Sequence, residues 1–69
     1  MINLTILNTA NNQEEHYAYD KEGQEYAFME NYMGMGIMYH IRAKFKTEDE
    51  LKDFMAEVEK AKGSKFKVA

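Results

Sequence analysis

Cysteine is absent from this 69-residue chain, as are proline and tryptophan. Without cysteine, neither a disulfide bond nor a thiolate metal site can stabilise the fold. A domain of this length is close to the lower limit for folding without such a cross-link. It therefore depends on its own hydrophobic core or shares a core with a second copy. The absence of cysteine is also compatible with a reducing compartment.

Long apolar runs are absent as well. No run approaches the roughly 20 residues that a membrane-spanning helix needs. The opening residues Met1-Ile2-Asn3 do not begin a signal or transit peptide. We therefore expect a soluble, cytoplasmic protein.

The charged residues are unevenly distributed, although the net charge is only −3. Residues 1–36 contain six acidic residues and one basic residue, whereas residues 37–69 contain eight basic and six acidic residues. Such an asymmetry is what an electrostatic surface for a partner requires, and it is equally consistent with two ordinary solvated faces.

The segment from Thr47 to Gly63 carries the clearest local signals. Thr47 and Glu50 have the spacing of a capping box, in which each side chain binds the other's free backbone N–H. Gly63 can adopt the left-handed conformation that ends a helix. Apolar residues recur at i, i+3, i+4 and i+7 and form one stripe, which we expect to be buried with Phe54 at its centre: Leu51, Phe54, Met55 and Val58.

Alternating apolar residues predict three strands outside this helix. The first covers residues 2–7, with Ile2, Leu4 and Ile6 on one face. The most regular alternation covers residues 37–45. Its predicted inward set is Ile37, Tyr39, Ile41, Ala43 and Phe45, and its outward set is Met38, His40, Arg42 and Lys44. A short strand at residues 65–68 follows the helix, with Phe66 and Val68 inward.

Residues 15–30 predict a hairpin. A turn of two or four residues sets Tyr19 opposite Tyr26. The same register sets Tyr17 opposite Phe28, so that four aromatic side chains share one face and stabilise each other across the strands. A three-residue turn would instead place the aromatic side chains of the two strands on opposite faces. We therefore prefer the even-length turn.

These elements give the order β-β-β-β-α-β. The predicted fold class is α+β, with an antiparallel sheet of four to five strands and one helix packed on one face. Residues 1–69 form a single small domain. The last strand pairs either antiparallel with the first strand or parallel beside the fourth.

The segment between the hairpin and the fourth strand has two glycines two positions apart and is more apolar than an ordinary loop. In a small domain without cross-links, such a segment is suited to an interface between two copies. We expect a homodimer with these contact residues: Tyr32, Met33, Met35 and Ile37.

Candidate catalytic and metal-binding residues are few. His16 and His40 lack the spacing of a zinc site. Ser64 lies in the tight turn after the helix, and no pair of carboxylates is marked by burial. We therefore expect no metal, no cofactor and no enzymatic activity.

Acidic residues and tyrosines are interleaved in the predicted hairpin, at residues 14–20 and 24–26. In a short, strand-rich chain without cysteine, this composition resembles that of small phage-encoded proteins that disable host factors. Some of these imitate DNA by presenting rows of carboxylates, and several act as dimers. The resemblance implies a basic protein target, although the basic second half of this chain departs from the usual composition of DNA mimics.

We therefore expect a protein-binding, inhibitory function in which the acidic hairpin contacts a basic host protein, such as a nucleic-acid-binding protein. The expected partner-binding residues are Glu14, Glu15, Tyr17, Tyr19, Asp20, Glu22, Glu25 and Tyr26. The alternative is a nucleic-acid-binding module with a basic strand surface. Its expected contacts are Arg42, Lys44, Lys46, Lys65 and Lys67.

Overall fold

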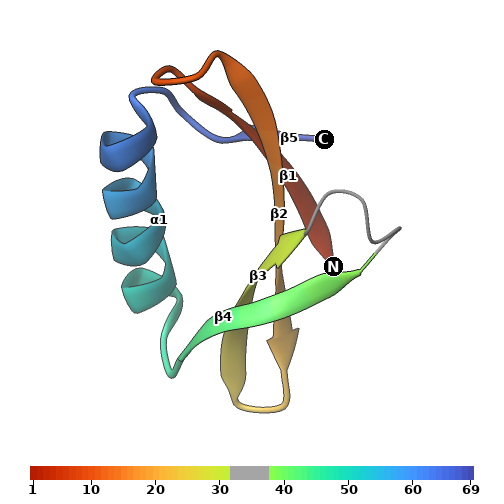
Figure 1. The fold of residues 1–69 in the computed structure, drawn as a ribbon. Helices are drawn as coiled ribbons and strands as arrows, with labels where there is room; N and C mark the ends of the chain where they lie inside the picture. The colour runs from red at the N-terminus through yellow and green to blue at the C-terminus, as the bar shows by residue number, and fades with distance from the viewer. Residues whose placement is uncertain (32–37) are drawn as a thin grey trace.

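The computed structural model of the chain describes residues 1–31 and 38–69. In these residues, one helix covers one face of an antiparallel sheet (Figure 1). The elements follow in the order β1 (Ile2–Asn8), β2 (Gln13–Glu22), β3 (Glu25–Asn31), β4 (Tyr39–Phe45), α1 (Glu48–Lys62) and β5 (Lys67–Val68). This arrangement confirms the predicted α+β fold and element order.

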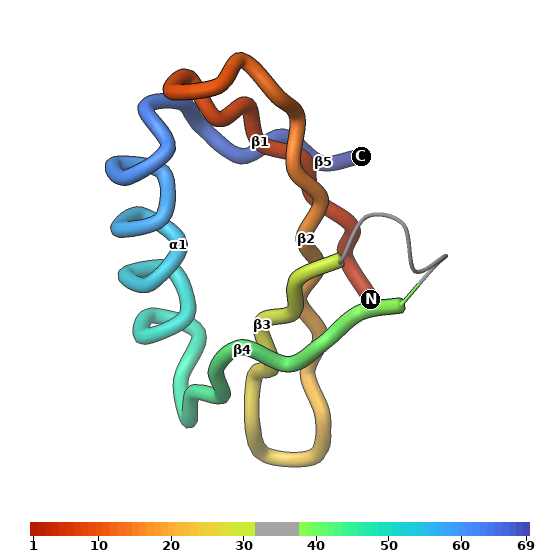
Figure 2. The backbone as a smooth tube through the Cα atoms, in the orientation of Figure 1, coloured from red at the N-terminus to blue at the C-terminus, as the bar shows by residue number. Residues whose placement is uncertain are grey.

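The strands are arranged in the order β4-β3-β2-β1-β5. The last strand pairs antiparallel with the first, so that Val68 lies opposite Leu4. Figure 2 shows this pairing as the blue end of the chain beside the red start. Of the two placements that the sequence left open, the structure has the antiparallel one, and β4 and β5 form the two edges of the sheet.

Both ends of α1 are formed as predicted. The Thr47 hydroxyl accepts a hydrogen bond from the Glu50 backbone N–H, and the Glu50 carboxylate accepts one from the Thr47 N–H, each at 3.2 Å. Gly63 has φ +79°, and its N–H donates to the Glu59 carbonyl at 2.9 Å. The helix boundaries follow from these local bonds, which explains why the sequence predicts them well.

The core lies between α1 and the sheet and is built around aromatic rings. Tyr17 and Phe28 stack with centroids 5.4 Å apart, and Phe54 meets Phe28 edge-on at 5.3 Å. Leu51 is the buried residue of α1, whereas Phe54 is half-buried. The expectation that Phe54 is the buried centre of the stripe is therefore wrong, because its ring lines a cavity between the layers.

The hairpin has the predicted even-length turn, but its register differs by two residues. Glu22 lies opposite Glu25, so that the turn consists of two residues and begins at Gly23, whose φ is +61°. Tyr19 therefore lies opposite Phe28, not Tyr26. A shift of two residues keeps every side chain on its face, so the four aromatic side chains still share one face.

Strand β4 departs from the predicted alternation because it contains a β-bulge. Ala43 lies opposite Phe28, but Ile41 lies opposite Met29, so Arg42 is an extra residue in the ladder. Tyr39 and Ile41, predicted inward, therefore face away from α1, and Ile41 is 48% exposed. Arg42, predicted outward, instead lies on the helix side.

Strand β5 is shorter than predicted and sits at the sheet edge. Phe66 contacts Tyr17 edge-on with ring centroids 5.6 Å apart, so its predicted inward orientation is confirmed. Val68 shares the helix side with Leu4 but is 75% exposed, because it belongs to the outermost strand. The predicted inward orientation of Val68 is thus confirmed, although the side chain is not buried.

The end of α1 is fastened to the turn between β1 and β2. The Lys62 carbonyl accepts hydrogen bonds from the Thr9 backbone N–H at 2.9 Å and from the Thr9 hydroxyl at 2.8 Å. A Cβ atom added to Gly63 would lie 2.3 Å from the Thr9 Oγ1 atom. Gly63 is thus needed both for its backbone conformation and for this close approach.

We predict that the two positive-φ glycines respond differently to alanine. Gly23→Ala meets only the backbone penalty, since nothing lies within 4 Å of its Cβ. It should lower the free energy of unfolding by about 1 kcal/mol. Gly63→Ala must also displace Thr9 and should cost about 2–3 kcal/mol. Urea denaturation measures both values.

The contribution of Thr9 can be separated with a third variant. In a Thr9→Ala background, the cost of Gly63→Ala should fall to that of Gly23→Ala, because the obstructing hydroxyl is gone. An unchanged cost in that background would contradict the proposed obstruction.

Candidate functional site

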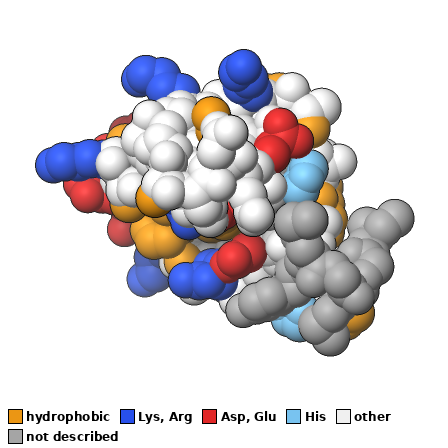
Figure 3. Space-filling model, turned by 45° about the horizontal axis from the view of Figure 1, so that its top comes forward, with side chains coloured by type: hydrophobic (Ala, Val, Ile, Leu, Met, Phe, Trp, Pro, Cys, Tyr) orange, Lys and Arg blue, Asp and Glu red, His pale blue; other side chains and the backbone are white. Residues whose placement is uncertain are grey.

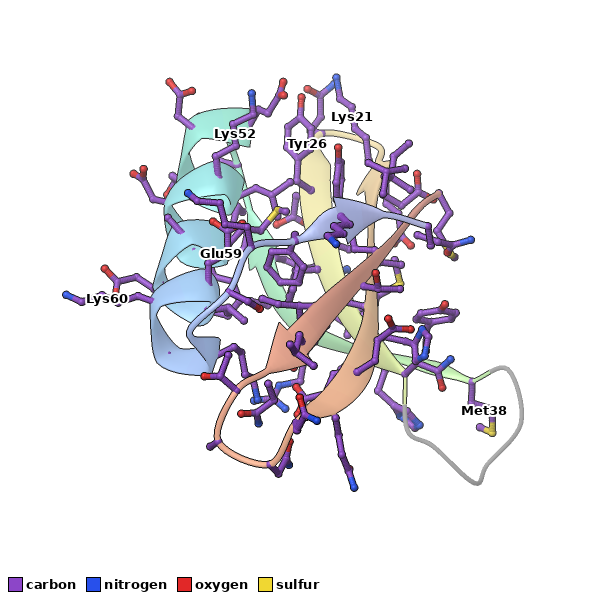
Figure 4. The ribbon with its side chains drawn as sticks, turned by 90° about the horizontal axis from the view of Figure 1, so that it is seen from above. Lys21, Tyr26, Met38, Lys52, Glu59 and Lys60 are labelled. Atoms are coloured by element: carbon purple, nitrogen blue, oxygen red, sulfur yellow. The ribbon has the colours of Figure 1, made fainter. Side chains whose placement is uncertain are left out.

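The residues predicted to contact a partner divide between the two faces of the sheet. Tyr17, Tyr19 and Tyr26 lie on the helix side, and Tyr17 is buried in the core. Tyr17 is therefore unavailable to a partner. Tyr19 and Tyr26 are half-buried, and Tyr26 lies below the Lys21 ammonium at 5.6 Å near the tip of the hairpin (Figure 4).

Four of the five predicted carboxylates point the other way. Because side chains alternate along a strand, residues out of phase with Tyr17 and Phe28 face away from α1. We call this side the outer face. Strands β2 and β3 contribute to it Glu14, His16, Ala18, Asp20, Glu22, Glu25, Ala27, Met29 and Asn31.

The carboxylates of the outer face have few cationic neighbours. Glu22 and Glu25 are exposed and lie directly opposite each other, an arrangement that disfavours the hairpin by charge repulsion. Within the described parts of the chain, neither forms an ion pair with a lysine or an arginine. Asp20 lies 3.6 Å from the N-terminal ammonium, and Glu14 lies 3.8 Å from His16 Nε2.

These carboxylates are unevenly spread over the outer face. Glu14 and Glu22 are eight residues apart on β2, a separation of about 26 Å along an extended strand. His16, Ala18 and Asp20 lie between them on the same face of β2, and Ala18, Ala27 and Met29 are buried. Asp20, Glu22 and Glu25 are thus near the tip of the hairpin and Glu14 is alone at the other end, so the predicted acidic residues do not form one continuous row.

Glu15, the fifth predicted carboxylate, has a structural role. It accepts hydrogen bonds from Lys62 Nζ at 2.8 Å, from Asn8 Nδ2 at 3.1 Å and from the Tyr17 hydroxyl at 3.0 Å. Burial acts to raise the pKa of Glu15, but these hydrogen bonds outweigh it and hold the pKa below the ordinary value. The pKa of Tyr17 is raised by its burial and by the bond to Glu15.

The basic residues of the alternative interpretation do not form one surface. Arg42 lies on the helix side in an ion pair with Glu30, whereas Lys44 lies opposite Ala27 on the outer face. Lys67 belongs to the other edge strand, about 19 Å away across the sheet. On the side drawn in Figure 3, the Lys and Arg side chains lie in separate groups.

A cavity between α1 and the sheet is the feature that sequence reasoning missed. Its volume is about 190 Å³, and it is open to solvent on one side. Among the described residues it is lined by Tyr17, Phe28, Glu30, Arg42, Phe54, Val58, Ala61 and Lys62. The apolar residues that line the cavity come from three elements, and the charged residues at its rim also come from three. No single stretch of sequence therefore indicates the cavity.

The remaining predicted residues provide no site in the structure. The four residues of the expected dimer interface, Tyr32, Met33, Met35 and Ile37, lie outside the described residues. Across residues 1–31 and 38–69, no cluster of three or more His, Cys, Asp or Glu side chains is arranged to hold a metal ion. His16 lies on the outer face, whereas His40 is opposite Glu30.

No helix in the part of the chain that the structure describes is long and apolar enough to cross a membrane. No protein-family model, curated protein or solved structure matches the chain.

We predict that Glu15 makes stability depend on pH. Its pKa is lower in the folded than in the unfolded chain, so its contribution is present above the ordinary value of 4.5. That contribution is lost as the pH falls through the folded pKa. Between about pH 6 and pH 3, the urea midpoint should therefore fall less in Glu15→Gln than in the wild type.

Glu14→Gln is the matched control, because it removes the neighbouring carboxylate without breaking the Lys62 contact. It should retain the pH dependence of the wild type. If Glu15→Gln shows the same pH dependence as this control, the network around Lys62 does not contribute as described.

Proposed function

We propose that this chain is a small protein-binding, inhibitory protein and not an enzyme. The carboxylates of its outer face contact a basic protein partner in the cytoplasm. The composition of this chain resembles that of phage-encoded DNA mimics, so we place the partner in the class of host nucleic-acid-binding proteins that such mimics inhibit.

One observation carries this proposal. Glu14, Asp20, Glu22 and Glu25 share the face that α1 leaves uncovered, and two of them repel each other across the hairpin. Repulsion between Glu22 and Glu25 works against the fold, so the arrangement is better explained by a contact outside the chain. A cationic surface would relieve that repulsion on binding.

The residues between these carboxylates are already covered. Ala18 and Ala27 are fully buried and Met29 is 5% exposed, so they offer a partner almost no contact area. The exposed carboxylates would therefore act mainly by raising the association rate.

We predict that reversing the charge at the tip of the hairpin weakens binding. Glu22→Lys with Glu25→Lys should reduce affinity for the basic partner about tenfold or more at roughly 0.1 M salt, mainly through slower association. The partner is first obtained by capture on the immobilised protein, and the rates are then measured by surface plasmon resonance.

Two further variants give the test its specificity. Asp53→Lys with Glu57→Lys produces the same change in net charge on the exposed side of α1, and it should leave binding nearly unchanged. An equal loss in both variants would mean that net charge, and not the outer face, controls binding.

Lys44→Glu with Lys67→Glu tests the alternative function. If only this variant loses binding and the wild type is retained on heparin at low salt, the chain binds nucleic acid.

We also propose a homodimer through the apolar segment that contains Met33 and Met35, as its composition favours. Sedimentation equilibrium at about 100 μM should give the mass of two chains, because a stable dimer forms at far lower concentrations. A monomer mass at that concentration would exclude it.

A further inference from the structure

The cavity between α1 and the sheet has the size and walls of a site for a single aromatic ring. Its volume is about 190 Å³. An apolar cavity of about 150 Å³ is known to accommodate benzene. The rings of Tyr17, Phe28 and Phe54 line it, with Val58 and Ala61 completing the apolar wall. A further ring would extend the edge-on contact that Phe54 already makes with Phe28.

Two cationic side chains lie at the rim of the cavity, and each is paired with one carboxylate. Arg42 from β4 and Lys62 from α1 both line it, and Glu30 is its one anionic lining residue among those that the structure describes. Arg42 Nη1 donates to Glu30, and Lys62 Nζ donates to Glu15 at 2.8 Å. A guanidinium has five N–H donors and an ammonium has three, so both cations retain donors for an additional anion.

The bulge in β4 is an independent indication that this rim has a function. Without it, regular alternation would turn Arg42 to the outer face, as the sequence predicts. The extra residue instead places the guanidinium on the helix side, beside the cavity and next to Glu30. Bulges that redirect a side chain are frequent beside binding and catalytic sites, and here the redirected side chain is the one best suited to bind a carboxylate.

We propose that this cavity binds a small aromatic carboxylate. Its ring lies against Phe28 and Phe54, and its carboxylate accepts hydrogen bonds from Arg42 and Lys62. The cavity is too small for a nucleotide, and the two cations at its rim favour an anionic ligand group over an amine. This activity is independent of the outer face, since the cavity opens on the other side of the sheet.

The probe is 3-phenylpropionate, and the neutral 3-phenylpropionamide is its matched control. Titration is followed by NMR through the methyl groups of Val58 and Ala61. The carboxylate should shift these signals and bind with a Kd of about 1 mM or tighter, as expected for so small a ligand. The amide should bind about tenfold more weakly, because it lacks the charge that Arg42 and Lys62 recognise.

Three variants locate the site. Arg42→Gln should weaken binding of the carboxylate about tenfold and leave binding of the amide unchanged. Lys44→Gln removes a cation from the opposite face of the same strand and should change neither. Val58→Phe places a ring in the cavity and should abolish binding of both probes. If Val58→Phe fails to fold, Ala61→Leu at the exposed rim replaces it.

Each contrary result overturns the proposal. The absence of a methyl shift up to about 10 mM probe would show that the cavity is a packing gap. Equal affinity for acid and amide, or equal effects of Arg42→Gln and Lys44→Gln, would exclude recognition of the carboxylate. Binding that survives in a folded cavity-filling variant would place the probe elsewhere.

Discussion

The two layers of this domain are held together through the ring of Phe28. It stacks on Tyr17 within the sheet, meets Phe54 of the helix edge-on, and lies 6.0 Å from Phe66, which precedes the last strand. Four separate segments thus contact each other through a single buried side chain. In a chain without cysteine, these ring contacts replace the cross-links on which many domains of this size depend.

Polar contacts also hold the end of α1 against the sheet. Lys62, the last residue of α1, is fixed at both its backbone and its side chain, since its carbonyl binds Thr9 and its ammonium binds Glu15. On the other side of the helix end, the Glu59 carboxylate accepts a hydrogen bond from the Phe66 N–H at 2.8 Å, whereas Lys60 points away from the sheet (Figure 4). The end of α1 is therefore held against the sheet from two directions, which keeps one wall of the cavity in place.

Local signals in the sequence were sufficient for some features and not for others. The helix boundaries depend on bonds between Thr47 and Glu50 and at Gly63, so neighbouring residues determine them. The hairpin was predicted with its faces correct and its register wrong by two, because the alternation of side chains is unchanged by a two-residue shift. In this hairpin the local pattern gave the face of each residue, but the partner across the strand depends on where the turn forms.

The candidate sites show the same division. The acidic residues were recognisable from composition, but their separation into Glu15 on the helix side, paired with Lys62, and four carboxylates on the outer face required the fold. The β4 bulge leaves no mark in the sequence, because Ile41, Arg42 and Ala43 continue a regular alternation. The cavity depends on that bulge and on residues from distant segments, so no local reading of the chain could have found it.

The position of Phe66 has a consequence for the order of folding. Tyr17 and Phe28 both contact this ring, although it is far from them in the sequence. Strands β1, β2 and β3 pair with their neighbours in the sequence, but the ring cluster stays incomplete until Phe66 reaches it. Contacts between distant segments form more slowly than local ones. The hairpin strands therefore pair before the aromatic core is complete, and the contact with Phe66 is a late step of folding.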